Sequence, residues 1–292
     1  MGRLIMLINT VLVFLQNILP IFVVISLLFA QQDARYKSSS QEKNHVSYLS
    51  IMYLLNTTGI GLIVVFLLSY FMPRLSQLSS GTGLEIVFSI LFSLIYCFIV
   101  TSFLLNLVSN NKQIQYQKLI HQKIGISLVI LLLVLCVHGS YFSLYVMSLT
   151  IQNTTIETLY SSIVVGVIIG TGICLSIAIL LYFILISLAK KSRSQIVCYF
   201  LLLFGVGQLI QGLQLLEQVD IISSNAHLWS TNYLIAEDSE LGYFLTILFG
   251  YEATPSAMEL IVYLSAIIVP MLIAKIIAYK QNSTASFMKG TS

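Results

Sequence analysis

Long apolar stretches, separated by short polar connections, constrain this chain more than any other feature of its sequence. A helix needs about 20 consecutive apolar residues to cross the hydrocarbon core of a bilayer. It also satisfies its own backbone hydrogen bonds, which lipid cannot do. We therefore predict an all-α, polytopic membrane protein whose single membrane domain covers residues 1–292. The predicted transmembrane helices lie near 4–29, 46–71, 83–109, 124–150, 159–189, 195–218 and 256–279.

Composition agrees with this fold class and excludes others. Hydrophobic residues make up 58% of the chain and charged residues 9%, whereas a soluble domain has about 25% charged residues. The net charge of +3 is small and its basic residues lie in short connections, which excludes a nucleic-acid-binding surface. The cysteines lie in apolar stretches without a CxxC pair, so we interpret them as small buried hydrophobic residues. They are Cys97, Cys136, Cys174 and Cys198.

The positions of lysine and arginine predict the orientation. Three basic residues lie in each of the first, third and fifth connections and three near the C-terminal end, and of all 14 only Arg3 and Arg74 lie elsewhere. The positive-inside rule places these four segments in the cytoplasm, so the N-terminus is outside and the C-terminus inside a plasma membrane or bacterial inner membrane. The residues are Arg35, Lys37, Lys43, Lys112, Lys118, Lys123, Lys190, Lys191, Arg193, Lys275, Lys280 and Lys289.

The longest stretch between predicted helices, residues 219–255, is then an extracytoplasmic loop. It contains five acidic residues and no lysine or arginine. Such a loop is either ordinary solvated surface or a vestibule that collects cations. The acidic residues are Asp220, Glu237, Asp238, Glu240 and Glu252.

Polar residues inside the predicted spans are candidate functional residues, because a polar group in hydrocarbon must find a partner. The first helix carries Gln16, Asn17 and Pro20 near its middle, and the fourth carries His138. These two helices would cross the membrane in opposite directions. We therefore predict an inverted repeat of spans 1–3 and 4–6 with a seventh helix added, and a midplane site at which Asn17 faces His138.

Two local arrangements in these helices support a site, and each has a structural alternative. Pro20 has no N–H, so the carbonyl near Gln16 loses its donor; that carbonyl could bind a cation, or the helix at 4–29 could simply be kinked. His138, Tyr141 and Tyr145 share one helix face at i, i+3 and i+7. An imidazole with phenols could ligate a metal or relay a proton. Alternatively, His138 hydrogen-bonds to a neighbouring helix.

The sixth predicted helix has a glutamine face. Gln208, Gln211, Gln214 and Gln218 fall within an arc of about 120°. Four amides on one face will not point at lipid, so they line an aqueous path or connect helices through hydrogen bonds.

Two further features concern packing and a carboxylate. Gly166 and Gly170 form a GxxxG pair, which predicts close packing of the fifth helix against another. Glu85 lies near the outer end of the third helix and, with His138, is a candidate metal ligand. An edge carboxylate can also simply reach the membrane interface.

Residues 248–256 (LFGYEATPS), followed by the last span through Met271, resemble the end of the high-affinity iron permeases of the Ftr/EfeU type, which are oxidase-dependent iron transporters. In that family a Phe-Gly-Tyr and a Pro-Ser likewise precede the seventh helix. Chain length, span number, orientation and the long outer loop also fit. The resemblance implies a permease for iron, with extracytoplasmic iron-binding or iron-oxidising proteins as partners that dock on residues 219–255.

The signature of that family is Arg-Glu-x-x-Glu in helices one and four, whose glutamates handle the iron. Here residues 16–20 (QNILP) and 137–141 (VHGSY) occupy the signature positions, so all four glutamates are absent while Gly139 matches. Glu85 resembles the acidic residue that opens the family's third helix. Iron that leaves water needs hard anionic oxygen ligands, for which amides and one imidazole are weaker substitutes.

Two functions follow. The first is a permease for iron or another divalent cation, with Gln16, Asn17, His138, Tyr141, Gln208, Gln211 and Gln214 as the substrate pathway. The second is a non-transporting homologue that serves as an assembly or regulatory subunit of an iron uptake system. An enzyme is disfavoured, because no HExxH, GxSxG, P-loop or paired intramembrane carboxylates occur. We expect no cofactor beyond a transported cation, no nucleic-acid partner, and membrane lipid around the chain.

Overall fold

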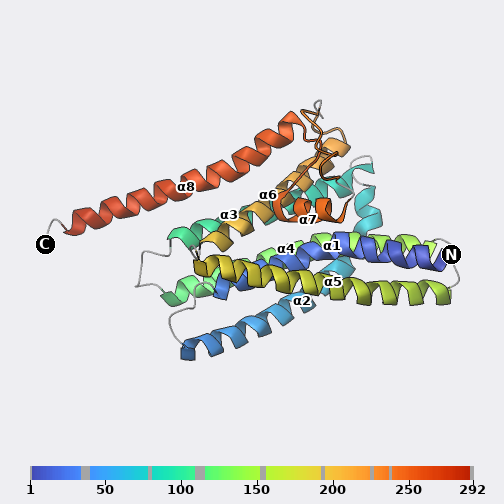
Figure 1. The fold of residues 1–292 in the computed structure, drawn as a ribbon, viewed down its shortest axis with the longest axis horizontal. Helices are drawn as coiled ribbons and strands as arrows, with labels where there is room; N and C mark the ends of the chain where they lie inside the picture. Colours follow the sequence, from blue (N-terminus) through green and yellow to red (C-terminus); the bar gives the residue numbers. More distant parts are fainter. Residues whose placement is uncertain are drawn as a thin grey trace.

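The computed structural model describes residues 2–33, 40–77, 81–108, 116–151, 156–191, 195–223, 227–236 and 239–289. This part of the chain forms an elongated bundle of α-helices (Figure 1). Arg35, Lys37, Lys112, Arg193, Glu237 and Asp238, which support the predicted orientation and acidic loop, lie outside the described residues. The helices are α1 (Gly2–Asp33), α2 (Ser40–Ser76), α3 (Gly83–Val108), α4 (Tyr116–Ile151), α5 (Ile156–Lys191), α6 (Ile196–Gln218), α7 (Glu240–Phe249) and α8 (Ala257–Lys289).

All the helices described except α7 are long and apolar enough to cross a membrane, which gives 7 candidate spans. The predicted fold class, an all-α polytopic membrane protein, is thereby confirmed. The spans are Met6–Asp33, Leu55–Ser76, Gly83–Asn106, Gln122–Leu149, Ser161–Lys191, Ile196–Gln218 and Ala257–Lys280.

The two ends of the bundle differ in the residues they carry. We call the end at which α6 finishes and α8 begins the loop end, and the opposite end the lysine end. Lys123, Lys190, Lys191 and Lys275 lie in the spans close to the lysine end. By the positive-inside rule this end is predicted to face the cytoplasm.

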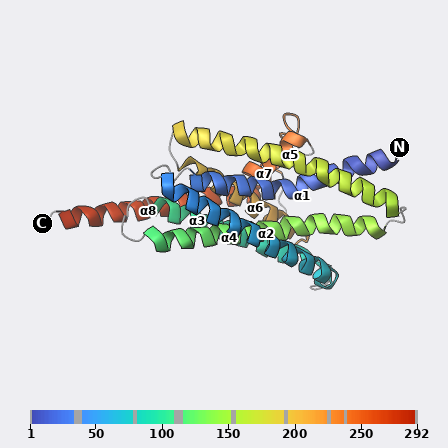
Figure 2. The same ribbon diagram turned by 90° about the horizontal axis from the view of Figure 1, so that it is seen from below.

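Helices that are distant in sequence pack side by side. The main partner of α1 is α5, that of α2 is α4 and that of α3 is α6, while α1 also contacts α4 (Figures 1 and 2). Glycines allow close approach of α5 to α1. A Cβ atom at Gly166 would lie 2.8 Å from Cγ2 of Thr10, and one at Gly170 would lie 2.5 Å from Cδ1 of Phe14. The predicted GxxxG packing is therefore confirmed, with α1 as the partner helix.

These pairings have the pattern that an inverted repeat would produce. Exchanging α1 with α4, α2 with α5 and α3 with α6 converts the α1–α5 contact into the α4–α2 contact. It leaves the α3–α6 and α1–α4 contacts in place. Superposition of the two halves is not established by contacts alone, so the repeat stays a prediction.

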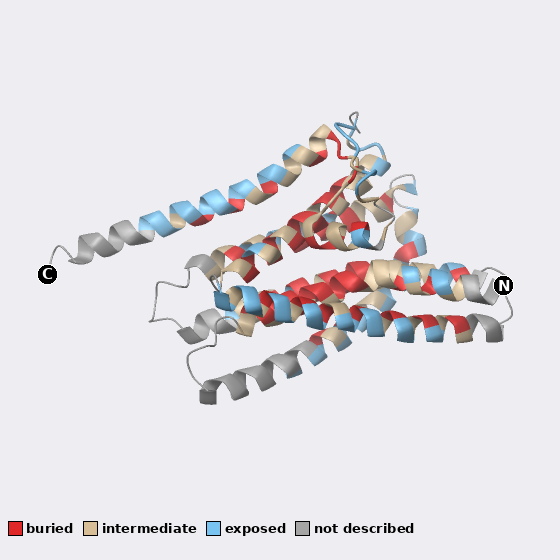
Figure 3. Ribbon diagram, in the orientation of Figure 1, coloured by how far each residue is buried: buried red, intermediate tan, exposed pale blue. Residues whose placement is uncertain are grey.

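The core lies along α1, α4 and α6, as the burial pattern in Figure 3 shows. By contrast, α2, α5 and α8 each keep a face of exposed large apolar side chains. Lipid tails are as apolar as these side chains, so such faces are suited to contact with lipid. The helix α8 packs mainly against α3 and α6 and diverges from the bundle toward its C-terminal end (Figure 1).

Cys97 corrects one prediction. Cys136, Cys174 and Cys198 are buried as predicted, but Cys97 is exposed. A membrane helix buries only the part of its circumference that faces other helices, and Cys97 lies on the remaining part of α3. An apolar sequence neighbourhood therefore did not distinguish a core position from a lipid-facing one.

The segment predicted as a non-helical loop contains the helix α7. Ser239 caps its start, since the Ser239 hydroxyl accepts a hydrogen bond from the N–H of Gly242 at 3.0 Å. Gly250 ends it in the left-handed conformation, at φ 65°. Ile247 and Leu248, in its last turn, are only 3% and 4% exposed. This apolar end is buried in the bundle and does not lie on an aqueous surface.

Candidate functional site

A histidine and a glutamine form a buried hydrogen-bonded pair near the middle of the membrane spans. Nε2 of His138, on α4, lies 2.9 Å from Oε1 of Gln208, on α6. His138 is 4% exposed and Gln208 is fully buried. With the amide oxygen as acceptor, Nε2 of the imidazole carries the proton. The Phe92 ring on α3 meets the imidazole edge to face, with centroids 5.8 Å apart.

The Gln208 amide is only half satisfied. Its Nε2 is buried and has no hydrogen-bond partner among the described residues. Leaving a buried N–H without an acceptor costs about 1–3 kcal/mol. The pair therefore offers an unused donor at the centre of the bundle, which a water molecule or a polar solute could satisfy.

The other glutamines of α6 connect this pair to the loop end. Gln208, Gln211, Gln214 and Gln218 follow one another at spacings of three, three and four residues, so they form one stripe along the helix. Their exposure rises toward the loop end: Gln208 is buried, Gln211 and Gln214 are half-buried and Gln218 is exposed. A polar stripe thus extends from the loop end to the buried His138–Gln208 pair.

The helix α7 packs on this stripe as a re-entrant segment. A Cβ atom at Gly207 would lie 3.0 Å from the backbone N of Gly250 and 3.3 Å from the carbonyl oxygen of Thr246. The C-terminal end of α7 therefore touches the middle of α6, backbone against backbone (Figure 1). Within a membrane, a segment that does not span is tolerated where protein buries it or where it lines a cavity. The carbonyl end of a helix also carries partial negative charge.

Toward the lysine end, the space around the pair is apolar. Leu131 and Val134 of α4, Leu201 and Phe204 of α6, and Leu27 of α1 are all fully buried. No water or ion passes through packing of this kind without a rearrangement. The polar stripe therefore ends at His138 and Gln208.

Asn17 and Gln16 are not brought to this pair by hydrogen bonds. Nδ2 of Asn17 donates to the carbonyl oxygen of Val13, one turn earlier in α1, at 2.8 Å. The partner of His138 is Gln208. Gln16 is half-buried, and α1 continues through Pro20 as one helix. The shared Asn17–His138 site stays a prediction that no direct contact supports.

The aromatic face of α4 meets three different helices. Tyr141 stacks on Phe88 of α3, with centroids 4.6 Å apart. The Tyr145 hydroxyl hydrogen-bonds to Oγ1 of Thr10 on α1 at 3.1 Å. His138 reaches α6. These side chains therefore diverge, and they do not converge on one ion.

Glu85 lies beside Tyr141 and away from His138. Its carboxyl interacts electrostatically with the Tyr141 phenol, and its Oε2 is buried without a hydrogen-bond partner in the part of the chain that is described. Among the described residues there is no group of three or more His, Cys, Asp or Glu side chains that could hold a metal ion. The two candidate ligands Glu85 and His138 are thus not joined into a metal site.

An acidic cluster at the loop end is a feature that the span-based prediction missed. Oε2 of Glu259, in the first turn of α8, accepts a hydrogen bond from the N–H of Ser256 at 2.7 Å, and Oγ of Ser256 accepts from the N–H of Glu259 at 3.2 Å. This is a capping box, which the Ser-x-x-Glu pattern could have predicted. Glu217 at the end of α6 interacts electrostatically with Glu259 and with His227.

Comparisons of this chain with protein-family models, with curated proteins and with solved structures find no match.

Proposed function

We propose that this chain is a permease, which carries a small cation between the loop end and the lysine end of the bundle. One observation carries the proposal: a polar stripe of glutamines leads from the exposed loop end to a buried histidine–glutamine pair with an unused hydrogen-bond donor. Polar side chains in a membrane bundle are expensive to bury and commonly mark a substrate pathway. The route runs along the glutamine face of α6, between α4 and α7.

Charge supports a cation as the transported species. No lysine or arginine occurs between residues 194 and 274, while Glu217, Glu252 and Glu259 lie within this stretch. An acidic entrance raises the local concentration of cations. The C-terminal end of α7, which carries partial negative charge, lies beside the middle of the route. By its resemblance to the iron permeases, iron or another divalent cation is the proposed cargo.

The side chains of the His138–Gln208 pair are uncharged, and this determines which cations the site can bind. Amide and imidazole groups are weaker ligands for a dehydrated multivalent ion than carboxylates. A cation that keeps part of its water shell suits the site better, because the bound waters remain its ligands and donate hydrogen bonds to neutral amide oxygens such as those of Gln211 and Gln214. We therefore propose that iron is a poorer substrate than divalent cations that retain water.

Uptake into liposomes tests the route. Purified chain is reconstituted with a metal-quenched dye inside, and influx of Mn²⁺ and Fe²⁺ is compared between the natural chain, Gln208→Leu and Asn106→Leu. Asn106, in the last turn of α3, also has a buried amide oxygen without a partner among the described residues. Gln208→Leu should abolish influx and Asn106→Leu should retain it. Equal influx through both variants, at matched protein content, would refute the route.

A non-transporting subunit is the second candidate. It is favoured by the lack of any three-ligand metal group in the described residues. The same liposomes separate the two functions. A folded natural chain that passes neither Mn²⁺ nor Fe²⁺ would support the subunit, and dye quenching that depends on Gln208 would exclude it.

A further inference from the structure

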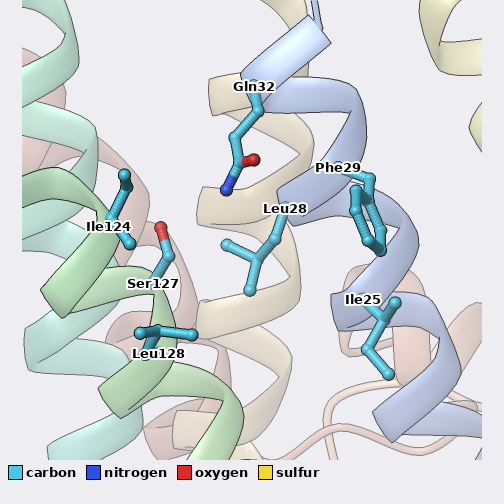
Figure 4. Close-up of a pocket in the computed structure, with 7 residues that line it drawn as sticks. All are labelled: Ile25, Leu28, Phe29, Gln32, Ile124, Ser127 and Leu128. Atoms are coloured by element: carbon cyan, nitrogen blue, oxygen red, sulfur yellow. The ribbon is translucent and has the colours of Figure 1, made fainter. Parts of the chain in front are cut away.

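A groove opens between α1 and α4 toward the lysine end (Figure 4). Its empty space of about 320 Å³ includes the part that is open to its surroundings, and its inner part has room for about one water molecule. Most of its wall is apolar, but the Gln32 amide and the Ser127 hydroxyl point into it from opposite sides (Figure 4). A water molecule needs at least two such polar partners. The lining residues are Ile25, Leu28, Phe29, Gln32, Ile124, Ser127 and Leu128.

The groove and the buried pair lie on the same face of α4. Ser127, Leu131, Val134 and His138 follow one another at spacings of four, three and four residues, which keeps them on one side of a helix. The 11 residues from Ser127 to His138 correspond to about 16 Å along the helix axis. The groove lies in the seam between α1 and α4, and this face of α4 continues from the groove to the pair at the centre.

Apolar side chains close this seam. Leu131 and Val134 are fully buried and Ile21, on the same side of α1 as the groove residues Ile25 and Leu28, is 5% exposed. Constrictions made of such residues exclude water and can act as gates in membrane pores. Polar groups thus lie on both sides of a short apolar barrier, with the glutamine stripe toward the loop end and the groove toward the lysine end.

We propose that the groove is the lysine-end mouth of the cation route, and that Ile21, Leu131 and Val134 form a hydrophobic gate between this mouth and the His138–Gln208 pair. This inference rests on the proposed function and identifies how that route is closed. The occupant of the mouth is water or a hydrated cation. The described conformation is then closed toward the lysine end, and the glutamine stripe reaches the exposed surface of the loop end at Gln218.

Thiol labelling tests the mouth. Ser127→Cys is made in a chain whose four native cysteines are replaced, and a membrane-impermeant cationic methanethiosulfonate is added to either side of oriented vesicles. The reagent should label Ser127→Cys from the lysine-end side only, and the label should block cation influx. Ser102→Cys is the matched control, because Ser102 on α3 is similarly buried, at 5% exposure against 9% for Ser127, and does not line the groove. It should stay unlabelled.

Passive leak tests the gate. Leu131→Ser should raise the leak of K⁺ and protons through liposomes several-fold, because a hydroxyl allows water into the barrier. Leu180→Ser, at a position 62% exposed on the outer face of α5, should leave the leak unchanged. Melting temperatures of both variants show whether each is folded. A folded Leu131→Ser chain that leaks no more than Leu180→Ser would overturn the gate.

The labelling and influx experiments can refute the mouth and the route along α6 independently of each other. If Ser127→Cys labels no faster than Ser102→Cys while Gln208→Leu abolishes influx, the mouth is refuted and the proposed route stands. If Ser127→Cys labels and blocks influx while Gln208→Leu has no effect, the mouth stands and the route along α6 is refuted.

Discussion

Two glycines at the contact between α6 and the end of α7 give a sharp test of the re-entrant segment. An alanine at Gly207 would place its Cβ 3.0 Å from the N and 3.2 Å from the Cα of Gly250, and 3.3 Å from the carbonyl oxygen of Thr246. All three are backbone atoms, which cannot rotate away as a side chain can. Overpacking of this kind costs about 1–3 kcal/mol. The better helix propensity of alanine returns up to about 1 kcal/mol.

Gly250→Ala should be more destabilising. Its Cβ would lie 2.8 Å from the Cα of Gly207, and the residue has φ 65°, which L side chains rarely adopt. The left-handed conformation costs a residue with a Cβ about 1–2 kcal/mol, and overpacking adds about 1–3 kcal/mol. We therefore expect a total of about 2–5 kcal/mol for Gly250→Ala, against about 0–2 kcal/mol for Gly207→Ala. Gly172→Ala is the control, because nothing lies within 4 Å of its added Cβ.

Thermal unfolding in detergent and cation influx in liposomes measure these effects. The melting temperature should fall in the order Gly172→Ala, Gly207→Ala, Gly250→Ala, and influx should fall with it because α7 forms a wall of the route. The single tryptophan, Trp229, lies in the segment between α6 and α7, so its fluorescence reports on this region. If Gly250→Ala melts and transports like Gly172→Ala, the packing of α7 against α6 is not as described.

Two further predictions concern topology and the buried pair. A reporter fused after Lys289 should read cytoplasmic and one inserted at Asn232 extracytoplasmic, because the basic residues gather at the lysine end; the same reading from both would contradict the orientation. In a double-mutant cycle on stability, His138→Phe and Gln208→Leu should couple by about 0.6 kcal/mol and at most about 1.7 kcal/mol, the range for hydrogen bonds between membrane helices; strictly additive effects would show that the hydrogen bond contributes nothing.

The transmembrane helices could be predicted because a single physical length, the thickness of the hydrocarbon core, sets the minimum apolar run. The ends of these helices could not be predicted in the same way, because a helical backbone can continue beyond the hydrocarbon core into polar surroundings. The helix predicted at 46–71 forms Ser40–Ser76, and the helix predicted at 256–279 forms Ala257–Lys289. Hydropathy reports where lipid begins, and it does not report where the helical backbone stops.

The candidate site was predictable in its members but not in its pairings. Helical period places His138 and Gln208 on faces of their own helices, yet it does not fix the rotation of one helix relative to another. The hydrogen bond between His138 and Gln208 depends on that rotation, so the sequence did not predict it. Asn17 satisfies its amide through the carbonyl of Val13 on the same helix, an option that short polar side chains always have in a helix. Matched depth in the membrane is thus too weak a criterion to predict a contact.

The re-entrant helix has sequence signals of its own at both ends. Ser239 is a good N-cap, Gly250 is a good helix stop, and the residues between them are mostly apolar. A helix of 10 residues is too short to cross the bilayer, and its apolar side chains would be costly to leave in water. A short helix that enters the bundle and returns to the same end, as α7 does, satisfies both constraints. The glutamine stripe of α6 points to the same answer, because a polar face inside the membrane needs a neighbour other than lipid, and α7 is that neighbour.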